Sequence, residues 1–138
     1  MKKLRATRIA SFMLVLALLL SPASAANEIQ PRYQKISIMS AELFGVSWLG
    51  KVTCVGSVSL WDTSCTARLT VDLQRSTDCS SWETIKTGSA SGDYDLIIEE
   101  DWYVTSGYYY QVVAGVTVFN SSGAYVEMDA AESAIIQY

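Results

Sequence analysis

Apolar and polar residues alternate with a period of two along most of the chain. The clearest run is residues 66–75, whose apolar positions are Ala67, Leu69, Val71 and Leu73. A period of two places successive side chains on opposite faces of a strand, whereas a helix repeats every 3.6 residues. The run therefore predicts a β-strand with one buried face and one solvent-exposed face.

Turn-forming residues separate such runs at short intervals, at residues 62–64, 76–81, 88–93 and 120–123. About seven strands are expected. Their ranges are 35–48, 51–60, 66–75, 82–87, 94–98, 108–119 and 124–136, the first of them open to a break near residues 41–45. This pattern is typical of an all-β, two-sheet sandwich of immunoglobulin or fibronectin-III type, with an up-and-down barrel as the competing architecture.

The first 25 residues have the composition of a secretory signal peptide. Four basic residues within the first eight precede an uncharged apolar run at 9–20, and the small residues Ala23 and Ala25 fit cleavage before Ala26. As a helix that run rises only about 18 Å, short of a hydrocarbon core of about 30 Å, so a retained anchor is the weaker alternative. We expect a secreted protein with a flexible leader at 26–34, a sandwich domain at 35–138, and no stable membrane insertion after cleavage.

Cleavage would leave a strongly acidic domain. Six basic and 14 acidic side chains remain after residue 25, a net charge of −8. This sign argues against binding to nucleic acid and against simple docking on anionic lipids. The chain has no histidine, which excludes Ser-His-Asp and Cys-His catalysis and histidine zinc sites. We therefore expect neither an enzyme nor a cofactor or metal.

Among the three cysteines, we consider one disulfide possible, between Cys54 and Cys79. Cys54 lies early in one predicted strand and Cys79 follows the end of the next, so an antiparallel course could bring them together. Cys65 and Cys79 flank a strand of about ten residues, which spans roughly 33 Å and excludes a bridge that needs Cα atoms within about 7 Å. A buried free thiol is the competing interpretation of Cys54.

Five short motifs span most of the chain from residue 52 onward. They are VTCVG at 52–56, LQRSTD at 73–78, SSW at 80–82, SGYYY at 106–110 and VFNSSG at 118–123. Together they resemble a family of small secreted proteins of Gram-positive bacteria. The resemblance implies an immunoglobulin-like sandwich without an assigned activity, and it supplies no catalytic or binding residues.

Two positions stand out within that resemblance. Relatives usually have glycine in an Asp-Gly-Ser-Ser-Trp turn where this chain has Cys79, and a non-glycine residue resists positive φ. Residues 108–114 also resemble the sixth strand of fibronectin-type sandwiches, in which a tyrosine hydroxyl bonds to the preceding corner. Tyr108 is our candidate for that tyrosine.

Large aromatic residues provide the candidate binding sites. Trp61 lies beside a turn, and alternation places Tyr109 and Phe119 opposite the inward face, where rings can stack on sugars or dock against a protein. We expect Trp82 and Tyr110 to be structural.

The acidic residues have a less specific pattern. Residues 99–101, with Asp93 and Asp95 nearby, could bind calcium, but solvated edge charge is the preferred interpretation. No spacing of carboxylates selects a catalytic pair such as two of Glu83, Glu99 and Glu127.

The sequence thus favours a non-catalytic module with a protein-interaction or structural role at or outside the cell envelope. The alternative is a carbohydrate-binding module for a glycan such as one of the cell wall, which requires several coplanar exposed rings on one face. A hydrolase would require two or more carboxylates that converge in a cleft.

Overall fold

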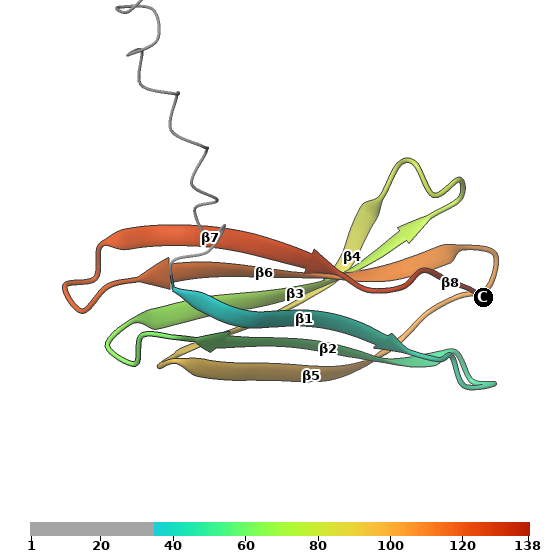
Figure 1. Ribbon diagram of the computed structural model, residues 1–138. Helices are drawn as coiled ribbons and strands as arrows, with labels where there is room; N and C mark the ends of the chain where they lie inside the picture. The colour runs from blue at the N-terminus through green and yellow to red at the C-terminus, as the bar shows by residue number, and fades with distance from the viewer. Residues whose placement is uncertain (1–34) are drawn as a thin grey trace, which may run out of the picture. The chain divides into compact units, whose positions relative to one another are not determined.

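The computed structural model describes residues 35–138, which form two antiparallel β-sheets (Figure 1). The expected signal peptide and leader lie outside these residues. The smaller sheet has the order β1-β2-β5, with bounds Ile36–Phe44, Lys51–Leu60 and Asp95–Tyr103. The larger has the order β4-β3-β6-β7, with bounds Glu83–Gly92, Thr66–Ser76, Tyr109–Phe119 and Tyr125–Glu132, and β8 (Ile136–Gln137) pairs with the start of β6.

The strand order confirms the predicted all-β sandwich. In constant-type immunoglobulin domains the fourth strand joins the sheet of the first, second and fifth strands. Here β4 pairs with β3 instead, which gives the fibronectin-III-like arrangement. No hydrogen-bonded strand pair connects the two sheets within residues 35–138, so this part of the chain is not a closed barrel.

The core lies between the sheets and follows the period-two pattern. Alternate residues of β2, β3 and β6 point inward. Side chains with no exposed surface include Val52, Cys54, Leu69, Val71, Leu73, Tyr110, Val112 and Val118. Burial of each large aliphatic side chain favours folding by about 1.5–3 kcal/mol.

The fourth and fifth strands are longer than predicted. Residues 88–93 were expected to form a turn, but β4 continues to Gly92 and β5 extends through the acidic residues to Tyr103. The small residues of β4 reflect close packing rather than a turn. A Cβ on Gly88 would lie 3.3 Å from Cγ of Glu100, and one on Gly92 would lie 2.9 Å from Cδ2 of Leu96.

The two terminal strand predictions also need correction. The first strand runs without a break from Ile36 to Phe44 and ends before residues 45–48. The final predicted strand, 124–136, is divided into β7 and β8, because backbone pairing with β6 shifts from one to the other. The hydroxyl of Ser133, between them, accepts a hydrogen bond from the Val112 N–H at 2.8 Å.

Tyr110, rather than Tyr108, forms the tyrosine corner. Its hydroxyl donates to the carbonyl of Thr105 at 2.5 Å, and its ring is fully buried. Tyr108 precedes β6, and the guanidinium of Arg75 lies over its ring. The guanidinium carbon of Arg75 is 4.7 Å from the centroid of the Tyr108 ring. The prediction was wrong because both tyrosines share the inward parity, and only Tyr110 lies deep enough to reach the corner.

Candidate functional site

The three predicted aromatic candidates do not form one flat platform. Trp61 is 71% exposed in the loop between β2 and β3. Tyr109 and Phe119 are half-buried at opposite ends of β6. The strand rise places these two residues roughly 33 Å apart, so they cannot both contact one sugar ring.

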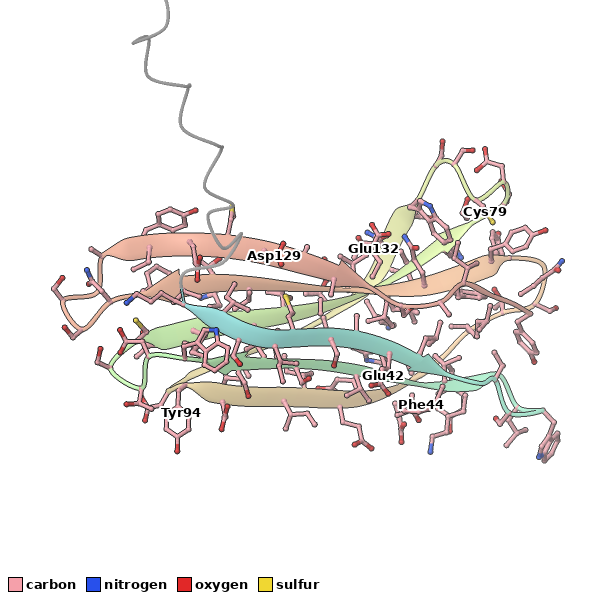
Figure 2. All side chains as sticks on the ribbon, in the orientation of Figure 1. Glu42, Phe44, Cys79, Tyr94, Asp129 and Glu132 are labelled. Atoms are coloured by element: carbon pink, nitrogen blue, oxygen red, sulfur yellow. The ribbon has the colours of Figure 1, made fainter. Side chains whose placement is uncertain are left out.

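The outer face of the smaller sheet carries exposed apolar side chains that the sequence analysis did not select. Ile38, Phe44, Ile97 and Tyr103 are 51–69% exposed, and half-buried Val55 lies at the centre of the same face. Figure 2 shows Phe44 near the end of β1. Isolated exposed apolar residues are ordinary, but several on one sheet face mark a candidate interaction surface.

Acidic side chains lie among these apolar residues. Strand register places Glu42 and Glu99 on either side of Val55, and neither carboxylate makes a hydrogen bond or ion pair within residues 35–138. Asp95 accepts a hydrogen bond from the hydroxyl of Ser59.

The carboxylate of Asp101 also has hydrogen-bond and ion-pair partners on this face. Its carboxylate accepts from the Thr53 hydroxyl at 2.6 Å and pairs with the Lys51 ammonium at 2.9 Å. These two interactions hold the pKa of Asp101 below its usual value, the Thr53 hydrogen bond being the larger cause. The face thus carries four acids against one lysine.

The turn between β1 and β2 extends the apolar surface. Trp48 is 87% exposed and Leu49 is 60% exposed at this turn. Gly50 joins the turn to the end of β5, because its carbonyl accepts from the N–H of Val104 at 2.8 Å. We call the combined surface the apolar–acidic face; its residues are Ile38, Glu42, Phe44, Trp48, Leu49, Ile97, Glu99 and Tyr103.

The outer face of the larger sheet is hollowed, and its outward positions mix polar residues such as Thr70 and Thr117 with the exposed apolar residues Tyr125 and Met128. One hollow of about 410 Å³ is lined by Arg68, Thr70, Gly115, Thr117 and Met128, with neighbours from β6 and β7. A second, of about 380 Å³, lies between Arg68 and Phe119. The larger sheet includes two of the predicted candidates, Tyr109 and Phe119, at opposite ends of β6, and Phe119 lines the second hollow.

The expected Cys54–Cys79 bridge is absent, and all three thiols are free. The prediction assumed that the second and third strands are neighbours, but they lie in different sheets. Cys54 is buried in the core, and burial raises its pKa to about 12. Cys79 is exposed at the tip of the β3–β4 hairpin, far from the core positions of β2 (Figure 2).

The carboxylates named as metal or catalytic candidates have separate surroundings. Glu83 pairs with Arg75 at 3.0 Å, and Glu127 accepts from the backbone N–H groups of Lys35 and Ile36 at 2.6 and 2.9 Å. Glu99 lies on β5 in the apolar–acidic face. Within residues 35–138, no three acidic or cysteine side chains are grouped so that they could hold a metal ion.

No protein-family model matches the chain, and no curated protein matches it significantly. In residues 35–138 there is no helix of the length and apolar character needed to cross a membrane.

Proposed function

We propose that this chain is a secreted, non-catalytic β-sandwich module that binds a protein partner at or outside the cell envelope. The observation that carries the proposal is the apolar–acidic face. Six of the eleven large apolar side chains exposed in residues 35–138 belong to this sheet face and its turn. Export is supported by the basic start, apolar run and small residues of positions 1–25. The motif resemblance to secreted Gram-positive proteins agrees with it.

The charges on the face favour a partner with basic groups beside apolar ones. Glu42 and Glu99 flank Val55 without a partner of their own in residues 35–138. A second copy of the chain would bring like charges together, and an anionic membrane would be repelled. A cationic protein surface would pair with the two glutamates, and Trp48 would supply an aromatic anchor of the type that dominates binding energy.

Affinity capture with matched variants tests this proposal. The mature protein and its Ile97→Lys and Glu42→Lys/Glu99→Lys variants are used to capture proteins from cell-envelope extract, and a captured protein is then purified and its dissociation constant measured. We expect roughly tenfold or greater weakening in both variants, because each removes an anchor or reverses the complementary charge. Binding should also weaken with added salt.

Ile135→Lys is the matched control, because Ile135 is 49% exposed but lies between β7 and β8. It should leave the dissociation constant unchanged. The proposal is contradicted if no protein is captured, if Ile135→Lys weakens binding as much as Ile97→Lys, or if the captured species is a second copy of the chain.

A further inference from the structure

A shallow trough crosses the outer face of the larger sheet. Thr70, Gly115 and Ala130 lie side by side on β3, β6 and β7, and their small side chains form its floor. The adjacent row is Arg68, Thr117 and Met128. Both rows line the hollow of about 410 Å³, a volume at the lower end of the range for small-molecule sites.

Arg68 also borders the second hollow, which continues toward Phe119. This hollow of about 380 Å³ is lined by Thr66, Arg68, Ser91 and Phe119, with Asp93 at its side. Strand register places Phe119 opposite Thr66. Thr66 and Arg68 are successive outward residues of β3, so the Phe119 ring is close to Arg68. The guanidinium therefore stands between two adjoining spaces, one over Gly115 and one beside an aromatic ring.

Arg68 is an exposed cation without an acidic partner in an acidic domain. Residues 35–138 hold 13 acidic and five basic side chains. Lys35, Lys51 and Arg75 each lie within 3.0 Å of a carboxylate. Arg68 makes no ion pair or hydrogen bond within this part of the chain, which leaves its five N–H donors available to a ligand.

The backbone around the trough argues against an extended peptide as the ligand. β3 pairs with β4 and β6, and β6 pairs with β3 and β7. Neither strand has a free edge at which a peptide could add main-chain hydrogen bonds. Recognition must come from the side chains, which offer a guanidinium, several hydroxyls and a ring.

We propose that this trough binds a carboxylate-bearing saccharide. The Arg68 guanidinium pairs with the carboxylate, a geometry in which two parallel N–H···O bonds form. The ring that carries the carboxylate occupies the hollow over Gly115, where the hydroxyls of Thr70 and Thr117 line the space. The next ring lies against Phe119. This site is on the other sheet from the apolar–acidic face and does not depend on the protein-binding proposal.

Titration with short hexuronic acid oligomers tests the proposal. Trimers of galacturonic, glucuronic and mannuronic acid, and the same trimers after reduction of their carboxyl groups, are added to the protein at physiological salt and followed by calorimetry. We expect at least one acidic trimer to bind and its reduced form to bind about tenfold more weakly, since a charge-assisted pair is lost. Arg68→Gln should cause a similar loss, and Arg68→Lys a smaller one.

Lys86→Gln is the matched control, because Lys86 is the other cation without an acidic partner in residues 35–138 and lies on edge strand β4, outside both hollows. It should leave binding unchanged. Gly115→Val should fill the trough and abolish binding; its Cβ would lie 3.1 Å from Oγ1 of Thr70, so Arg68→Gln decides the matter if that variant does not fold. Absence of binding by every acidic trimer at millimolar concentration overturns the proposal. Equal binding of acidic and reduced forms, or equal losses in Arg68→Gln and Lys86→Gln, also overturns it.

Discussion

The β3–β4 and β6–β7 turns share a left-handed backbone position but fill it with different residues. Gly123 has φ of 81° in the β6–β7 turn, and Cys79 has φ of 57° in the β3–β4 turn. Glycine adopts this conformation freely, whereas a residue with a Cβ loses about 1–2 kcal/mol there. Cys79 is the one non-glycine residue with positive φ among residues 35–138.

Each turn is held by one short polar side chain, and the two side chains differ in charge. Asn120 accepts from the N–H groups of Ser122 and Ala124, both at 3.0 Å. Asp78 accepts from the N–H groups of Ser80 and Ser81, both at 2.9 Å. The hydroxyl of Ser76 also donates to Asp78, at 2.9 Å.

Hydrogen bonds to a carboxylate are stronger than those to a neutral amide. We infer that the charged acceptor holds Cys79 in a conformation that otherwise favours glycine.

Thiol labelling should show that Cys79, the left-handed residue of the β3–β4 turn, has a solvent-accessible thiol. Cys79 is exposed, while Cys54 and Cys65 are buried and burial raises the pKa of both thiols. With reduced protein and an aromatic disulfide reagent, we expect one thiol to react rapidly in the native state and all three to react in denaturant. Rapid reaction of two or more native thiols would contradict the placement of the cysteines.

Gly123→Ala should destabilise the protein by about 1 kcal/mol, because alanine resists positive φ. A Cβ at this position would meet no atom within 4 Å, so the loss is conformational rather than steric. Denaturant unfolding followed by tryptophan fluorescence measures it. Ser121→Ala, in the same exposed turn, is the control and should change the unfolding free energy by a few tenths of a kcal/mol at most. An equal effect of both substitutions would mean that the left-handed position is not the sensitive one.

Cys79→Gly should have the opposite sign and a smaller size. Removal of the Cβ relieves the left-handed strain, but glycine also gives the unfolded chain more freedom, so we expect a net gain of about 0.5 kcal/mol. Cys79→Ala keeps the Cβ and should leave the unfolding free energy nearly unchanged. A loss of stability in Cys79→Gly would show that the thiol stabilises the turn by a contact that outweighs its strain.

The sequence predicted the sandwich because its central strands have both a clean alternation and a strong apolar face. Residues 66–75 illustrate this, since the predicted strand differs from β3 by one residue. The prediction was weaker for β4, whose glycines and serines usually indicate a turn. There the close approach of β5 requires small side chains, as at Gly88, and this contact between distant segments has no local signal.

The apolar–acidic face was missed for two reasons. Ile38 has the same parity as buried Ile36, but a register shift between them turns Ile38 outward, and a bulge of this kind cannot be read from alternation. Ile97 lies between the inward Leu96 and Ile98. Three consecutive apolar residues, 96–98, were the one available signal of an apolar side chain on the outward face.

The trough on the larger sheet shows a different limit. Phe119 was selected from its outward parity, and that orientation agrees with the hollow it lines. Alternation also predicts that Arg68 points outward, but no surrounding sequence motif marked it as a binding residue. Its significance depends on Gly115 lying beside Thr70, 45 positions away in the sequence, and on Ala130 lying beside Gly115. Strand register, rather than composition, creates the candidate site.

The charge difference between the two turns should appear as a difference in pH dependence. Backbone hydrogen bonds from Ser81 and Ser80, and then the Ser76 hydroxyl, hold the pKa of Asp78 below its usual value. A carboxylate whose pKa is lower in the folded state contributes stability that is complete above the unfolded value of about 3.9 and is lost as pH falls through the folded value.

Asp78→Asn should therefore be less stable than the wild type at neutral pH and approach it in acid, as measured by denaturant unfolding across that range. Asn120→Asp is the reciprocal change and should add acid sensitivity to the β6–β7 turn. Other acids with lowered pKa values, such as Asp62 and Asp101, remain in all three proteins and cancel in the differences. If wild type and Asp78→Asn lose stability in parallel on acidification, the Asp78 charge does not hold the β3–β4 turn, and the left-handed Cys79 must be held by the strand pairing alone.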